Sequence, residues 1–212
     1  MIPIVSIEPR ETALIVIDAQ NAFCHPDGTL GQSGVDVSPL LEVVPAIGRL
    51  VERCRTAGIQ DIWTRQIHFA DDRARAAHRI TPHTLKRKRV ACQPGSWDAE
   101  IVDELKPLVP GPEYVIDKHK WGIFYGTRLD PLLRILGTKL LVVCGTTTNA
   151  CVDTSVREAY MRDYDVVVVR ECVAGVKPEW HELALEVWSQ YIGEVVGLDE
   201  LEAALPERSA AA

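Results

Sequence analysis

Short apolar runs alternate with longer amphipathic segments along the chain. Six of the runs are mostly β-branched and bounded by turn residues, as expected of strands covered on both faces. The predicted strands are Ala13–Ile17, Ile59–Thr64, Tyr114–Ile116, Lys139–Val143, Asp165–Val169 and Glu194–Val196. The amphipathic segments predict helices over Pro39–Ala57, Asp98–Leu108, Arg128–Leu136, Ala150–Arg162, Pro178–Tyr191 and Asp199–Ala204.

Strands that alternate with helices predict an α/β fold with right-handed crossovers. We expect a three-layer α/β/α, Rossmann-like domain over residues 1–212, with a predominantly parallel sheet of about six strands and helices on both faces. Residues 69–95 lack periodicity and predict an excursion, either a lid or an oligomer contact. Its basic run Lys86–Arg89 is either a solvated face or a contact for a substrate carboxylate or a partner. We expect a disordered tail after residue 206.

Composition narrows the class of partner. The chain has 23 basic and 30 acidic residues and a formal net charge of −7, which argues against nucleic acid or an anionic membrane and favours a small molecule. No targeting or membrane-spanning segment is expected, so the predicted location is cytoplasmic. Six cysteines stand at positions 24, 54, 92, 144, 151 and 172, without close pairing, and we expect all of them to be reduced.

Three reactive side chains follow predicted strands. Asp18 follows the first strand, Lys118 the third, and Cys151 the fourth, so all three should meet at the carboxyl edge of a parallel sheet, where ligands bind. Gly145 breaks the fourth apolar run, and the helix that follows should place Cys151 near its N-terminus, where the helix dipole stabilises a thiolate. Singly, these residues could be a core cysteine, a turn or cap aspartate and a surface lysine.

Together they supply what cysteine hydrolysis needs. A carboxylate within hydrogen-bond reach can accept the proton of a thiol, and a nearby ammonium favours the charged arrangement that results. Backbone N–H groups at the start of a helix can bind a developing oxyanion.

Three segments carry a family resemblance. They are ALIVIDAQNAF around Asp18, VIDKHKWGIFYGTRL around Lys118 and VVCGTTTNACVDTSVREAYMRDYDVVVVRECVAG around Cys151. In this order, they resemble the isochorismatase-like cysteine hydrolases. The resemblance implies a catalytic triad of Asp18, Lys118 and Cys151, and a non-proline cis peptide between Thr146 and Thr147. It also implies an oxyanion hole made by the N–H groups of Thr147 and Cys151.

The resemblance further implies a reaction. Isochorismatases proper lack the nucleophilic cysteine, so Cys151 favours hydrolysis of a C–N bond through a thioester, with release of ammonia or an amine. The third segment and GTRLDPLLRILG look most like members that act on ureido compounds and small amides. We therefore expect a linear amide or ureido (carbamoyl) substrate, no cofactor, and a homo-oligomer, dimer or tetramer. The alternatives are a nicotinamidase-like hydrolase, a catalytically silent binding protein and a redox sensor.

A metal site is not expected. The nicotinamidases of this family bind a metal through an aspartate and histidines after the second strand, but Gln66 stands here in place of the aspartate, although His68 fits. The sequence also lacks CxxC and HExxH motifs. His68 and His78 could form a partial site, but polar or substrate-contacting roles are the more ordinary ones.

Several further residues are candidates for substrate contact or support of the site. Gln20 should orient Asp18 or the loop after it, and Asn149 should hold the nucleophile turn by hydrogen bonds to the backbone. Phe23, Trp121 and Phe124 could line an apolar pocket wall or belong to the core.

Overall fold

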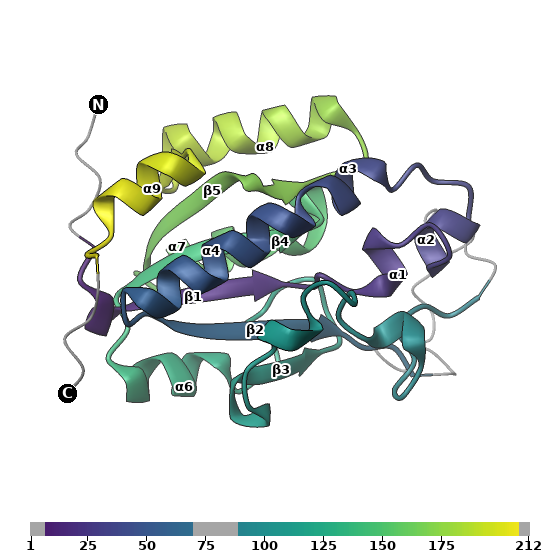
Figure 1. Cartoon of the computed structure of the whole chain (residues 1–212), viewed down its shortest axis with the longest axis horizontal. Helices are drawn as coiled ribbons and strands as arrows, with labels where there is room; N and C mark the ends of the chain where they lie inside the picture. The colour runs from purple at the N-terminus through teal and green to yellow at the C-terminus, as the bar shows by residue number, and fades with distance from the viewer. Residues whose placement is uncertain (1–6, 70–88, 208–212) are drawn as a thin grey trace.

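The computed structural model describes residues 7–69 and 89–207, and its centre is a six-stranded parallel sheet (Figure 1). The strand order is β3-β2-β1-β4-β5-β6, the order of a Rossmann-like fold, and every neighbouring pair is parallel. The strands are β1 (Thr12–Ile17), β2 (Gln60–Gln66), β3 (Val115–Lys118), β4 (Leu140–Thr146), β5 (Asp165–Ala174) and β6 (Glu194–Val196). All six predicted strands are confirmed, five of them with shifted bounds.

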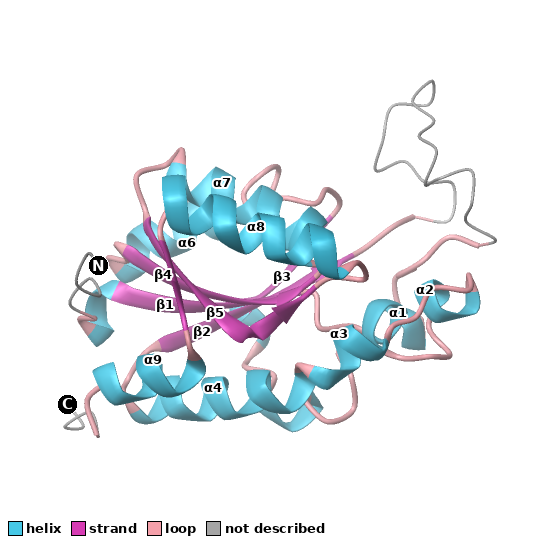
Figure 2. Ribbon diagram, turned by 90° about the horizontal axis from the view of Figure 1, so that it is seen from above, coloured by secondary structure: helices cyan, strands magenta, loops and turns pink. Residues whose placement is uncertain are grey.

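Helices cover both faces of the sheet (Figure 2). One face carries α3 (Ser38–Glu42), α4 (Val44–Thr56) and α9 (Leu198–Ala204), and the other carries α6 (Leu129–Leu136), α7 (Asp153–Tyr160) and α8 (Pro178–Tyr191). Two short helices, α1 (Asn21–Cys24) and α2 (Thr29–Gln32), follow β1 and were not predicted. The three-layer α/β/α architecture predicted from the sequence is therefore confirmed.

The central strand β1 explains why the sheet needs both helical layers. All six of its residues are buried, and successive side chains of a strand point to opposite faces. Leu14 and Val16 belong to the apolar cluster that includes α4 and α9, whereas Ile15 and Ile17 belong to the cluster that includes α6, α7 and α8. Apolar burial of this kind stabilises a fold by about 25 cal/mol per Å².

The helix predicted over Asp98–Leu108 is wrong. The helical structure in this stretch is limited to two 3₁₀ turns, Trp97–Ala99 and Lys106–Leu108. The backbone between them is hydrogen-bonded to the loop that follows β1. Ile101 forms an antiparallel bridge with Gln20, and the Asn21 N–H donates to the Glu100 carbonyl at 2.9 Å. Backbone groups paired in this way cannot also form the hydrogen bonds of a helix.

Two other predicted helices are interrupted. Pro39–Ala57 is split into α3 and α4 around Val43, because Pro45 in the first turn of α4 lacks the N–H that would continue a single helix. Ala150–Arg162 begins instead as a π-helical turn, Thr148–Val152, and continues as α7.

Residues 70–88 and 208–212 lie outside the described residues, and with them most of the predicted excursion and the end of the predicted tail. In the part of the chain that the structure describes, no helix has the length and apolar character needed to cross a membrane.

Gly145 near the end of β4 allows a close approach to β1. Its φ is +117°, and a Cβ built on it would lie 2.1 Å from the Ile17 carbonyl oxygen. Any side chain at this position would collide with the backbone of β1. Because Asp18 follows Ile17 directly, this contact also sets how closely the ends of β1 and β4 lie together.

We expect Gly145→Ala to lower the free energy of unfolding by about 3 kcal/mol or more, because it combines overpacking against backbone with an unfavourable φ. Gly137→Ala is the matched control, since Gly137 also has a positive φ (+69°) but nothing lies within 4 Å of its added Cβ. The control should lose only about 1 to 2 kcal/mol. Denaturant unfolding measures both, and equal losses would show that the close approach to Ile17 is unimportant.

Candidate active site

Asp18, Lys118 and Cys151 come together at the carboxyl edge of the sheet, as the alternation of strands and helices predicts. Asp18 follows β1 directly, Lys118 is the last residue of β3, and Cys151 lies in the π-helical turn after β4. Asp18 and Lys118 are completely buried, and Cys151 is 7% exposed. Three segments that are distant in sequence thus meet in one shielded site.

The centre of the site is a buried ion pair. The Lys118 Nζ lies 2.6 Å from Oδ2 of Asp18, and the Thr64 hydroxyl donates to Oδ1 at 2.7 Å. The Asp18 carboxylate interacts with the Lys118 ammonium and also with the Cys151 thiol. It therefore lies where it can exchange a proton with Cys151.

Lys118 is held from two further directions. Its ammonium donates to Oε1 of Gln66 at 3.0 Å and to the main-chain carbonyl of Lys120 at 3.1 Å. Burial alone lowers the pKa of Lys118, but the charges of Asp18 and Cys151 raise it, and the net direction is upward. Lys118 therefore stays protonated at neutral pH, where it acts as a fixed positive charge.

The pKa of Cys151 is shifted in the direction opposite to that expected for a thiolate stabilised at a helix N-terminus. Burial raises its pKa to about 12; Lys118 lowers the pKa, and Asp18 raises it. The residue lies inside the π-helical turn rather than at the first turn of α7, and the cost of burying an anion dominates. At rest, the site holds a thiol beside a carboxylate, so the nucleophile requires proton transfer.

The turn before Cys151 has the geometry that the resemblance implies. The peptide bond between Thr146 and Thr147 is cis. Thr146 Oγ1 donates to the Asp18 carbonyl at 3.0 Å, and Thr148 Oγ1 lies 2.9 Å from Nδ1 of His181 on α8. Side chains therefore tie the turn to β1 and to α8.

Alternate residues at the end of β2 were missed as a group. Thr64, Gln66 and His68 are buried, and their alternate spacing places them on one side of the strand. Thr64 contacts Asp18, Gln66 contacts Lys118, and Gln66 Nε2 lies 3.3 Å from Nε2 of His68. The alternate spacing of these polar residues could have indicated a shared role, but polar residues are also common where a strand runs into an ordinary loop.

Gln20 supports the loop after Asp18, as predicted. Its amide nitrogen donates to the carbonyls of Gln66 and Ala99 at 3.0 and 2.8 Å, and its amide oxygen accepts from the Gln66 N–H at 2.7 Å. Phe23 is partly buried and packs against two apolar clusters.

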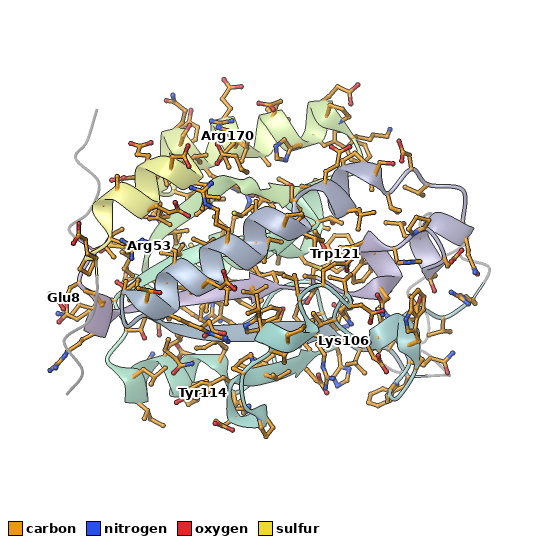
Figure 3. The ribbon with its side chains drawn as sticks, viewed as in Figure 1. Glu8, Arg53, Lys106, Tyr114, Trp121 and Arg170 are labelled. Atoms are coloured by element: carbon orange, nitrogen blue, oxygen red, sulfur yellow. The ribbon has the colours of Figure 1, made fainter. Side chains whose placement is uncertain are left out.

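The other two aromatic candidates occupy different environments. Phe124 is core: it is buried, stacks on Tyr164 with ring centroids 5.8 Å apart, and lies under the Arg162 guanidinium. Trp121 is 49% exposed and lies toward the end of the sheet to which the strands point (Figure 3).

The backbone hydrogen bonds predicted for the Asn149 side chain are not made by its oxygen. Oδ1 is buried and has no partner among the described residues, because the turn is held instead by Thr146 and Thr148.

The described residues contain no group of three or more His, Cys, Asp or Glu side chains that could hold a metal ion. His68 is within hydrogen-bond distance of Gln66 and of the Ala91 carbonyl, while His78 lies outside the described residues. Of the basic run Lys86–Arg89, only Arg89 is described, and it bonds to Thr29 and Asp98.

Fold and site together define a three-layer α/β enzyme whose reactive groups gather at the carboxyl edge of its sheet. A model of the isochorismatase domain matches residues 12–200, and the chain belongs to the isochorismatase family of hydrolases. It is 36% identical over 192 residues to the ureidoacrylate amidohydrolase RutB of Pantoea ananatis, covering 85% of this chain and 76% of that protein.

Two solved structures show the same fold. A cysteine hydrolase from Pseudomonas syringae pv. phaseolicola superimposes with a TM-score of 0.81 at 26% identity, covering 95% of each chain. N-carbamoylsarcosine amidase from Thermoplasma acidophilum superimposes with a TM-score of 0.70 at 27% identity, covering 89% of this chain and 97% of that one.

The opposing effects of Asp18 and Lys118 on the pKa of Cys151 give a test that needs no substrate. Removing the negative charge with Asp18→Asn should lower the pKa of Cys151, which increases the thiolate fraction at any pH below that pKa. Iodoacetamide should therefore alkylate Cys151 faster at pH 8 in Asp18→Asn than in the wild type, as measured by mass spectrometry of the Cys151 peptide.

Asp117→Asn is the matched control, because Asp117 is the neighbour of Lys118 in β3 but is exposed and paired with Arg65. Its rate should equal that of the wild type. Slower alkylation in a folded Asp18→Asn protein would contradict the assigned charge arrangement.

Proposed function

We propose that the protein is a cysteine-dependent amidohydrolase that cleaves a C–N bond of a small linear amide or ureido (carbamoyl) compound through a thioester. The observation that carries the proposal is the buried meeting of a thiol, a carboxylate and an ammonium at Cys151, Asp18 and Lys118. This arrangement matches the requirements of an activated nucleophile next to its base.

The first half of the reaction forms the covalent intermediate. The carboxylate of Asp18 accepts the proton of Cys151, and the thiolate attacks the carbonyl carbon of the substrate. Lys118 keeps the total charge of the site balanced while the proton moves. The oxyanion accepts hydrogen bonds from the N–H groups of Thr147 and Cys151, which are worth far more in a site shielded from water than in solution.

The second half regenerates the thiol. Asp18 returns the proton to the departing nitrogen, the C–N bond breaks, and ammonia or an amine leaves while the carbonyl carbon stays bonded to Sγ. Water then enters, Asp18 accepts one of its protons, and the resulting oxygen nucleophile displaces Sγ, which recovers the proton. Asp18 gives that proton back to Sγ and so acts first as base and then as acid in each half of the reaction, a cycle typical of covalent hydrolysis.

The substrate class rests on chemistry and on the relatives. Ureidoacrylate amidohydrolase and N-carbamoylsarcosine amidase both have names that describe a carbonyl carbon between nitrogens. A nicotinamidase-like activity has less support, because Gln66, at the position of the metal-binding aspartate, hydrogen-bonds Lys118 and lies beside His68. The cytoplasmic location and the homo-oligomer, dimer or tetramer, remain predictions; light scattering would test the latter.

The test is an ammonia-release assay over ureido acids, biuret-like compounds, small aliphatic amides and nicotinamide. We expect a linear ureido compound or amide to be hydrolysed, and Cys151→Ala to lower kcat by at least about 10³-fold, as loss of a nucleophile does in related covalent mechanisms.

Cys172→Ala is the control, because Cys172 is also a buried thiol but belongs to the core; it should keep turnover. Near wild-type hydrolysis by a folded Cys151→Ala protein would refute the covalent mechanism, and nicotinamide as the sole substrate would refute the substrate class.

A further inference from the structure

A continuous chain of buried polar contacts extends from Lys118 through Gln66 and His68. Lys118 Nζ lies 3.0 Å from Gln66 Oε1, Gln66 Nε2 lies 3.3 Å from His68 Nε2, and His68 Nδ1 lies 3.0 Å from the Ala91 carbonyl. All three side chains are buried, with exposed fractions of 0%, 2% and 7%. The chain links the fixed charge of the site to the segment that follows residue 88.

The chemistry of Lys118 determines the direction of every bond in this chain. An ammonium can only donate, so the Gln66 atom that faces it must be the amide oxygen. The Gln66 NH₂ group then faces His68, whose Nε2 must be unprotonated to accept from it. The His68 proton therefore resides on Nδ1 and is donated to the Ala91 carbonyl, which defines the tautomer of the ring.

Gln66 contributes to the site through its side chain independently of its backbone. Its N–H donates to Gln20 Oε1 at 2.7 Å, and its carbonyl accepts from Gln20 Nε2 at 3.0 Å. Gln20 thus holds the end of β2 from both directions, and the backbone of Gln66 should stay in place when the side chain is replaced.

We infer that Gln66 and His68 are positioning residues that hold the Lys118 ammonium between Asp18 and Cys151. The inference rests on the proposed function, in which Lys118 balances charge while the Cys151 proton moves to Asp18. An amide suits this task because it supplies an acceptor to Lys118 without adding a negative charge, which would compete with Asp18. Neutral His68 prevents the amide from turning its NH₂ group toward the ammonium.

The experiment compares Gln66→Met with Gln60→Met. Methionine removes the amide but keeps the length of the side chain, and Gln60 is at the opposite end of β2, where its side chain donates to the Asp61 carbonyl. Iodoacetamide alkylation of Cys151 as a function of pH is measured first because it needs no substrate. Steady-state hydrolysis of the amide found in the ammonia-release assay is measured second.

In Gln66→Met, Lys118 should lower the pKa of Cys151 less effectively, so alkylation at pH 8 should slow several-fold. The kcat should fall on the order of 10-fold to 100-fold, as expected for a misplaced catalytic group, with KM within about twofold of the wild type. Gln60→Met should change neither quantity. A folded Gln66→Met protein with unchanged alkylation and kcat would overturn the inference.

His68→Phe tests the same chain from its other end, and it decides the question if Gln66→Met does not fold. It removes the closer acceptor of the Gln66 NH₂ group and leaves the contact of 3.5 Å to the Ile67 carbonyl. It should therefore also slow alkylation and lower kcat; unchanged values would overturn the inference. Where both variants fold, the double variant should be no worse than Gln66→Met, because residues that act through one another are not additive. If the losses in kcat of the two single variants simply add in the double variant, Gln66 and His68 have separate roles, which would count against the inference.

The Cys151→Ala variant separates the positioning role of Gln66 and His68 from the covalent mechanism itself. If Cys151→Ala abolishes hydrolysis while Gln66→Met and His68→Phe behave as wild type, the covalent mechanism stands and only the positioning chain is refuted. If Cys151→Ala keeps its turnover, the proposed function itself is refuted, whatever the alkylation data show.

Discussion

The buried contact between Asp18 and Lys118 is the constraint on which the rest of the site depends. Two opposite charges with no exposure to water are tolerated only when each also has well-placed polar partners. Those partners come from other strands: Thr64 and Gln66 from β2, and the Lys120 carbonyl from the loop after β3. The strands β1, β2 and β3 must therefore end at the same level for the charges to be satisfied.

The same burial determines how the thiol can react. A cysteine exposed at a helix start would be partly ionised and open to alkylation or oxidation. Cys151 is instead shielded, and its pKa is raised to about 12, so it rests as a thiol. In the proposed mechanism, Asp18 takes its proton as the substrate carbonyl is attacked. Gly145 contributes by letting the nucleophile turn approach β1 without a side chain in between.

Much of the architecture could be predicted from the sequence because each strand carries its own signal. Fully buried parallel strands are short and β-branched, and the residue that follows each one must lie at the carboxyl edge. Asp18, Lys118 and Cys151 could be placed together on that basis. The segment Asp98–Leu108 could not be read in the same way, because its amphipathic pattern is helical while its backbone pairs with the loop after β1.

Properties that arise from several elements together were the hardest to predict. The protonation state of Cys151 depends on burial by other segments, which raises its pKa. The helix dipole, considered alone, predicts a lowered pKa. The role of Gln66 depends on Lys118 and His68, which meet it only in the folded sheet.

The covalent intermediate is the central claim, and trapping it is the most direct test. The enzyme is mixed with a hydrolysed amide or ureido substrate, quenched with acid during the first turnover, digested and analysed by mass spectrometry. The peptide that contains Cys151 should carry the mass of the acyl or carbamoyl group, and the adduct should vanish as the substrate is consumed. Release of the first equivalent of ammonia or amine with Cys151 unmodified, or with the adduct on another residue, would contradict the claim.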